Sequence, residues 1–181
     1  MSRPDEPNPV KLIVGLLAPT AELAQWAVSH LEWVLGPVDL ISEAVPFDWT
    51  DYYRPELGPG LTRRWISFLE LVNPGRLAEF KLVAVDLEQK LARPDGRRRV
   101  NLDPGLLSLE GLVLASTKKA GHRIYLGQGV WAELTLIFEE GRFKAFKWTY
   151  PDYAAGLFMD FAQALRKRYK MQLKEGQWSE A

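Results

Sequence analysis

A short apolar run near the start of the chain limits the fold more than any other feature. Residues Val10 to Ala18 are almost all apolar, and Pro9 and Pro19 bound the run on either side. A run of this length without polar alternation is typical of a strand that is buried on both faces. It therefore favours a layered domain in which a sheet packs against other elements.

The periodicity of the first half of the chain predicts two units of strand, helix and strand. The expected elements are a strand at Val10–Ala18, a helix capped by Thr20 and ended by Gly36-Pro37, a strand at Val38–Val45, a loop at Pro46–Gly60, a strand at Leu61–Val72, a helix from Asn73-Pro74 to Leu91 and a strand at Arg97–Leu102. This order is that of the split βαβ, or ferredoxin-like, arrangement, which we expect as the core.

The second half is predicted to extend the sheet and to add helices. After a turn at Asp103-Pro104-Gly105, the expected elements are a helix capped by Ser108, a strand at His122–Leu126, a hairpin of Val130–Phe138 and Phe143–Trp148 joined through Glu140-Gly141, and a helix capped by Asp152 with Phe158, Phe161 and Leu165 inward. The sequence thus predicts an α+β fold with a mixed, largely antiparallel sheet and about four helices.

Composition indicates one domain that folds without a disulfide or metal cross-link. Apolar residues make up 47% and charged residues 25% of the chain, as in ordinary globular domains. We expect a single domain over residues 10–173 with disordered tails at 1–9 and 174–181. The absence of cysteine excludes disulfides and thiolate sites and suits a reducing compartment. Without a signal peptide or a bilayer-spanning apolar stretch, a cytoplasmic protein with no membrane contact is expected.

Charge directs the search for a site to local clusters. The chain carries 23 basic and 23 acidic side chains, so no overall field attracts nucleic acid or a membrane. Neither the Gly-x-x-x-x-Gly-Lys-Ser/Thr loop nor the Gly-x-Gly-x-x-Gly motif occurs. Binding of an anion must therefore come from a local patch.

Carboxylates cluster in the loop that follows the second predicted strand. Asp48 and Asp51 lie three residues apart and could hold a hard cation such as Mg²⁺, or serve as a catalytic base and a positioning group. The alternative is turn chemistry, because Asp and Thr often hydrogen-bond their own backbone in turns. Tyr52 and Tyr53 follow directly and are candidate ligand-binding residues.

Arginines form a second candidate cluster. The run Arg97-Arg98-Arg99, interpreted as part of a strand, sends Arg98 to the face opposite its neighbours. With Arg63 or Arg64 it could bind phosphate or carboxylate bidentately. The alternative is a charged sheet edge that resists aggregation.

The stretch from Ser116 to Tyr125 combines hydroxyl, ammonium, guanidinium and imidazole groups. His122 is a candidate general acid or base, with Glu133 or Asp103 as its orienting partner, although a solvated or structural histidine is the alternative. Lys118, Arg123 and Tyr125 are candidate ligand-binding residues because charge and aromatic stacking occur together there. Trp49, Trp131 and Trp148 fall in or near loops and either stack on a ligand or fill core edges.

Several long motifs resemble one family. These are Phe47-Asp-Trp-Thr-Asp-Tyr-Tyr53, Gly60-Leu-Thr-Arg-Arg64, Gly96-Arg-Arg-Arg-Val-Asn-Leu-Asp-Pro-Gly105, His122-Arg-Ile-Tyr-Leu-Gly127 and Trp148-Thr-Tyr-Pro-Asp-Tyr153. Together they are similar to an uncharacterised bacterial and archaeal family, DUF4416, from about Val10 to about Leu173. That family has no established activity, so the resemblance assigns no residue a role.

Three functions remain open from the sequence. The first is a binding domain for a phosphate-bearing ligand, either a nucleotide or RNA. The second is a hydrolase or transferase that acts on such a ligand through Asp48, Asp51 and His122. The third is a protein–protein interaction module anchored by exposed aromatic side chains. The test that separates them is whether these side chains meet in one cleft.

Overall fold

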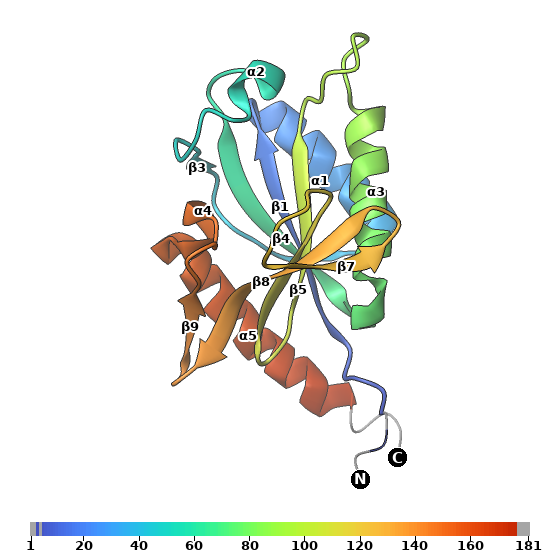
Figure 1. The fold of residues 1–181 in the computed structure, drawn as a ribbon, viewed down its shortest axis with the longest axis vertical. Coiled ribbons are helices and arrows are strands. Elements are labelled where there is room, and N and C mark those ends of the chain that lie inside the picture. Colours follow the sequence, from blue (N-terminus) through green and yellow to red (C-terminus); the bar gives the residue numbers. More distant parts are fainter. Residues whose placement is uncertain (1–2, 4, 177–181) are drawn as a thin grey trace.

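The protein is a three-layer α+β domain built on one antiparallel sheet (Figure 1). The computed structural model describes residue 3 and residues 5–176. The strands are β1 (Val10–Ala18), β2 (Val38–Ile41), β3 (Val45–Pro46), β4 (Thr62–Val72), β5 (Asn101–Leu107), β6 (Gly111–Ser116), β7 (Arg123–Gly127), β8 (Val130–Glu139) and β9 (Arg142–Ala145). The helices are α1 (Ala21–Leu35), α2 (Arg54–Leu57), α3 (Leu77–Lys90, after a 3₁₀ turn at Pro74–Arg76), α4 (Pro151–Ala154) and α5 (Gly156–Gly176).

The first half of the chain forms the predicted split βαβ core. Its strands lie in the order β2–β4–β1–β5, so each of the two strand–helix–strand units has a strand of the other unit inserted between its own strands. The sheet continues through β6, β8 and β7, while β3 pairs with β4 and β9 with β8. Every strand pairing in the described part of the chain is antiparallel. The prediction of an α+β fold is confirmed.

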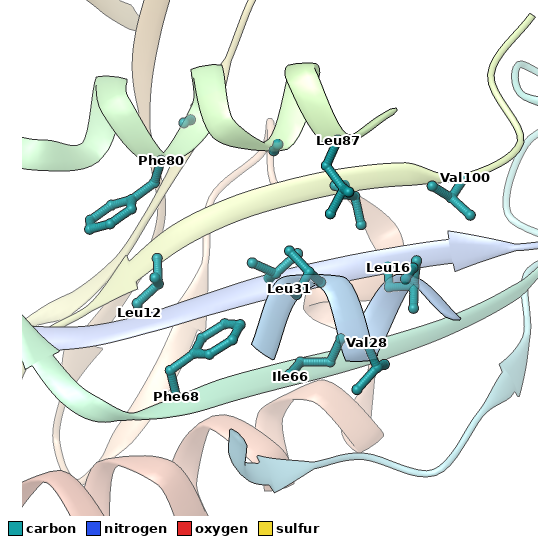
Figure 2. Close-up of a cluster of buried hydrophobic side chains, with 14 of the residues drawn as sticks. Leu12, Leu16, Val28, Leu31, Ile66, Phe68, Phe80, Leu87 and Val100 are labelled. Atoms are coloured by element: carbon teal, nitrogen blue, oxygen red, sulfur yellow. The ribbon is translucent and has the colours of Figure 1, made fainter. Parts of the chain in front are cut away.

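Strand β1 is buried on both faces, as its apolar run predicts. Because side chains alternate along a strand, Leu12 and Leu16 point toward α1 and α3 and belong to one cluster. Leu12 lies between Phe68 and Phe80, and Leu16 lies further along, near Val28 (Figure 2). Ile13 points to the other face and joins the cluster under α5. Burial of each such side chain stabilises the fold by about 1.5–3 kcal/mol.

Two predicted caps begin the helices that cover the first face. The Thr20 hydroxyl accepts a hydrogen bond from the Leu23 amide, and the Asn73 side chain accepts one from the Gly75 amide. Helix α1 ends before Gly36, whose φ of 95° suits glycine. Phe158 and Leu165 of α5 are buried, as expected.

The prediction of a strand at Arg97–Leu102 is wrong. The three arginines lie in the loop before β5, which begins at Asn101, so they do not alternate between two faces of a sheet. The predicted turn at Asp103-Pro104-Gly105 lies inside β5 instead. Proline is tolerated there because β6 pairs with β5 only from Gly105 onward, which leaves the first half of β5 without a partner on that side.

The prediction of a helix capped by Ser108 is also wrong. Ser108 instead accepts hydrogen bonds from the amides of Glu110 and Gly111, which closes a tight hairpin between β5 and β6. Short apolar runs fit either periodicity, so the pattern could not separate the two. Asp152 is an internal residue of α4 and not its cap, which is Tyr150.

Other boundaries shift slightly. The predicted strand Val38–Val45 is divided into β2 and β3, and the loop after it contains the short helix α2. Helix α5 runs to Gly176 and so includes the first three residues of the predicted C-terminal tail. The other tail residues at 177–181, and residues 1, 2 and 4 of the N-terminal tail, lie outside the described part. Within that part no helix combines the length and apolarity needed to cross a membrane.

Candidate functional site

A cleft of about 600 Å³ lies where the sheet splits between β5 and β6. The two strands pair from Gly105 to Leu107, but beyond Leu114 strand β6 continues only beside β8. The two strands therefore leave a wedge-shaped gap between them. The loop 47–53, the loop after β6 and α4 cover this gap. Leu114 and Ala115 form an apolar part of the wall, and the remaining lining is mostly aromatic or charged.

Two side chains of α3 replace the strand that β5 lacks on this side. The Lys81 ammonium donates to the Leu102 carbonyl at 2.8 Å, and the Leu102 amide donates to Glu88 Oε1 at 2.6 Å. Lys81 and Glu88 are seven residues apart, two turns of one helix face. Burial raises the pKa of the Glu88 carboxyl, against the opposing charge of Lys81. The open edge of β5 is thus satisfied without another strand.

The floor of the cleft holds a buried arginine between two carboxylates. Arg63 Nε donates to Asp152 Oδ2 at 2.8 Å, and Arg63 Nη1 donates to Asp103 Oδ2 at 3.3 Å. Asp103 Oδ2 also accepts a hydrogen bond from the side-chain amide nitrogen Nδ2 of Asn101 at 2.7 Å. Burial raises the pKa of Asp152, and the Arg63 guanidinium opposes that effect. This arginine is therefore neutralised by the protein itself.

Arg98 is likewise committed to carboxylates. Its guanidinium forms a bidentate pair with Glu56 of α2, at 2.9 Å and 2.6 Å, and it also donates to Glu88 and Asn101. Such a fork fixes both partners in one geometry. Arg98 thus ties the loop before β5 to α2, and it lines one side of the cleft.

Arg123 and Glu133 form the opposite wall. Arg123 Nε donates to Glu133 Oε2 at 2.7 Å, and a second nitrogen donates to the Tyr150 hydroxyl at 2.9 Å. His122 Nε2 lies 2.9 Å from the same Glu133 oxygen, and its ring stacks on Trp148. Glu133, one of the two partners considered for His122, is thus its neighbour, although His122 is not among the residues that line the cleft.

Lys118 lies at the mouth of the cleft beside an aromatic rim. Its ammonium donates to the Tyr52 hydroxyl at 2.7 Å and sits 3.9 Å from the centre of that ring. Within the described residues no carboxylate lies within 4 Å of it. Trp49 and Tyr52 are more than half exposed, and Tyr53 packs edge-on against Tyr52.

Two buried polar atoms of the lining have no hydrogen-bond partner among the described residues. They are the Tyr153 hydroxyl and Glu133 Oε1, and each residue is only 1% exposed. Burial raises the pKa of Tyr153 well above its ordinary value, so the hydroxyl stays protonated. An unpaired polar group in such a place costs about 1–3 kcal/mol. A bound water, or a ligand group that reaches them, would supply the missing partner.

The other predicted site residues lie elsewhere. Asp48 and Asp51 line a separate depression of about 240 Å³, where Asp51 pairs with Arg54 at 3.0 Å. Tyr125 lies exposed on β7 and packs against Trp131. The structure does not gather Asp48, Asp51 and His122 around the cleft. No group of three or more His, Cys, Asp or Glu side chains suited to a metal occurs among the described residues.

Six of the seven predicted ligand-binding residues line the cleft, and sequence reasoning missed several others. The six are Tyr52, Tyr53, Arg63, Arg98, Lys118 and Arg123. The missed residues include Lys81, Glu88 and Tyr153. Lys81 and Glu88 could have been found from the sequence, because they are charged residues next to the apolar stripe of α3. A charge that is buried with such a stripe needs a polar partner, so its position indicates a polar site nearby. Tyr153 ends a motif quoted above, but nothing in its pattern indicates a cleft.

The fold and the cleft define an α+β domain whose antiparallel sheet opens into a ligand-sized cavity. Within that class, the chain belongs to the family described as domain of unknown function, DUF4416, whose model matches residues 8–169. The resemblance inferred from the sequence motifs is thereby confirmed. Comparisons with curated proteins and with solved structures each gave no match.

Proposed function

We propose that this domain binds a small phosphate-bearing ligand in the cleft and that the ligand is a nucleotide. The volume of about 600 Å³ lies within the usual range for small-molecule sites. The lining joins an aromatic rim to polar side chains that converge from distant segments. A nucleotide offers a planar base for the first and a charged phosphate for the second.

Lys118 is the observation that carries this proposal. The arginines of the cleft are each paired with a carboxylate, so their charge is already balanced inside the protein. Lys118 has a neutral hydroxyl as its partner instead. An ammonium with no carboxylate within 4 Å in the described part of the chain is suited to a phosphate group, and the rings of Tyr52 and Trp49 in the same lining offer flat surfaces for a base.

This charge arrangement favours a mononucleotide over a longer chain. Binding to RNA needs a series of basic side chains that release counterions along the backbone. In the cleft, Arg63, Arg98 and Arg123 serve instead to hold its walls together. We therefore assign the phosphate contact to Lys118.

Equilibrium binding of the four nucleoside 5′-monophosphates tests this proposal. At least one should bind, and inorganic phosphate should bind more weakly because it lacks a base to stack. Lys118→Met should weaken nucleotide binding by about ten- to a hundredfold, since a charged hydrogen bond contributes about 1.5–3 kcal/mol. Isothermal titration calorimetry measures all of these affinities.

Lys119→Met is the matched control, because Lys119 is exposed and does not line the cleft. It should leave the affinity unchanged. If no mononucleotide binds, or if the two lysine variants bind like the parent, the proposal is wrong. Tighter binding of short RNA than of any mononucleotide would point to a nucleic acid as the ligand instead.

A further inference from the structure

Glu133 presents a carboxylate oxygen to which no described residue donates a hydrogen bond. Its Oε2 is held by Arg123 at 2.7 Å and by His122 at 2.9 Å, whereas Oε1 has no partner in the described part of the chain. Because the two donors fix the carboxylate, it cannot turn to satisfy Oε1 elsewhere. An ionised carboxylate only accepts hydrogen bonds, so a group that satisfies Oε1 must be an O–H or N–H donor.

Asp103 supplies a second such oxygen from the other side of the wedge. Its Oδ2 accepts from Arg63 and Asn101, while Oδ1 accepts no hydrogen bond from the residues that the structure describes and lies 3.7 Å from the Lys81 ammonium. Asp103 belongs to β5 and Glu133 to β8, beyond β6. The unpartnered hydroxyl of Tyr153 lines the same cleft. Among the described residues of the lining, Glu133 and Asp103 thus each keep a carboxylate oxygen without a hydrogen-bond donor, and Tyr153 keeps a hydroxyl without a partner.

On the basis of the proposed function, we infer that Glu133 accepts a hydrogen bond from the sugar hydroxyls of the bound nucleotide, so that the cleft selects ribonucleotides over deoxyribonucleotides. A ribose diol carries two adjacent O–H donors, and the free oxygens of Glu133 and Asp103 are acceptors of the kind that such donors need. Carboxylates are common partners of ribose hydroxyls in nucleotide sites. Removal of one hydroxyl leaves a buried acceptor unpaired, and sites built to bind a hydroxyl reject ligands that lack it.

The test compares ligands first, with the unmodified chain. Adenosine 5′-monophosphate and its 2′-deoxy and 3′-deoxy analogues, or the same set on whichever base binds, are titrated by calorimetry. At least one deoxy analogue should bind about ten- to a hundredfold more weakly. Equal affinities for all three overturn this inference and leave the proposed function intact. Absence of binding by every nucleotide overturns the proposed function itself.

Glu133→Gln then tests the residue. Arg123 only donates hydrogen bonds, so the amide oxygen must face it, and the amide NH₂ takes the place of Oε1. A donor thus replaces the free acceptor, so a sugar hydroxyl can no longer donate at this position and can only accept from a neutral amide, and the preference for ribose should decrease. Glu139→Gln, an exposed position on the same strand, is the matched control and should keep the preference. An undiminished ribose preference in Glu133→Gln would overturn the assignment, and if that variant does not fold, the ligand comparison alone decides.

Discussion

Gly15, in the middle of β1, lies directly against the side chain of Tyr153. The space that a β-carbon would fill there is occupied by the Tyr153 hydroxyl, and an Arg63 nitrogen lies 3.1 Å from the same point. Both side chains are almost fully buried. The absence of a side chain at Gly15 therefore lets the cleft floor approach the sheet backbone closely.

Gly15→Ala should destabilise the protein by about 1–3 kcal/mol, because the new methyl group overlaps the Tyr153 hydroxyl in a packed interior. Urea denaturation measures the change. Gly121→Ala is the control, since a β-carbon at Gly121 meets open space. Equal effects of the two substitutions would contradict the packing argument.

Single residues also show which contacts a local sequence pattern can predict and which it cannot. Asp152 was predicted as a helix cap because aspartate before a helix usually has that role. In the structure it binds Arg63, which is 89 residues away in the sequence. A local pattern contains no information about a partner at that distance. Capping by Thr20 and Asn73 could be predicted because cap and helix are neighbours in the chain.

At the scale of elements, α3 does more than cover a face of the sheet. Through Lys81 and Glu88 it binds both backbone groups of Leu102 and so completes β5. Glu88 is 3% exposed, and burial raises the pKa of its carboxyl above the ordinary 4.5. The folded state therefore holds this proton more tightly than the unfolded state does.

The stability of the parent relative to Glu88→Gln should depend on pH. Below pH 4.5 Glu88 is protonated in both states and its contribution is greatest. As the pH rises, the unfolded chain loses this proton first, so the advantage of the parent decreases until the folded carboxyl also ionises. Urea midpoints of both proteins between about pH 4 and pH 8 measure this. An advantage that grows with pH would show that the pKa is lowered instead.

The errors in predicting elements have one cause. The segment that follows Leu102 is predicted as a turn and a helix, but it forms most of the β5–β6 hairpin. Its proline and glycine are typical of a turn. They are accepted within β5 because that strand is open on one side near Pro104 and closely packed at Gly105. Those conditions are tertiary, so the local pattern could not contain them.

At the scale of the whole molecule, β1 joins two hydrophobic clusters that lie on opposite faces of the sheet. This arrangement was predictable, because an apolar run without alternation implies burial on both sides. The cleft was not predictable. Its mouth joins Tyr52 to Lys118, which are 66 residues apart, and only the complete sheet brings those loops together.

Both clusters should unfold together, because β1 belongs to each. Phe80→Ala on one face and Phe158→Ala on the other should each destabilise by about 3–5 kcal/mol within a single transition. Tryptophan fluorescence and far-UV circular dichroism, followed during urea denaturation, should give coincident curves. Leu157→Ala, at a position 37% exposed, is the control with an expected effect within about 0.5 kcal/mol. Two separate transitions would show that the faces are independent.

The hydrogen bonds from α3 to β5 also bear on how the ligand preference of such a cleft can change during evolution. Because both polar groups of Leu102 are already bound by side chains, the backbone at this point offers nothing to a ligand. Recognition of any ligand there would rest on side chains that project from an intact scaffold. Replacing one of them can change what is recognised while the hydrogen bonds of the sheet stay in place. Ligand preference and architecture can therefore be inherited separately, and descendants of one fold can acquire new specificities by single substitutions.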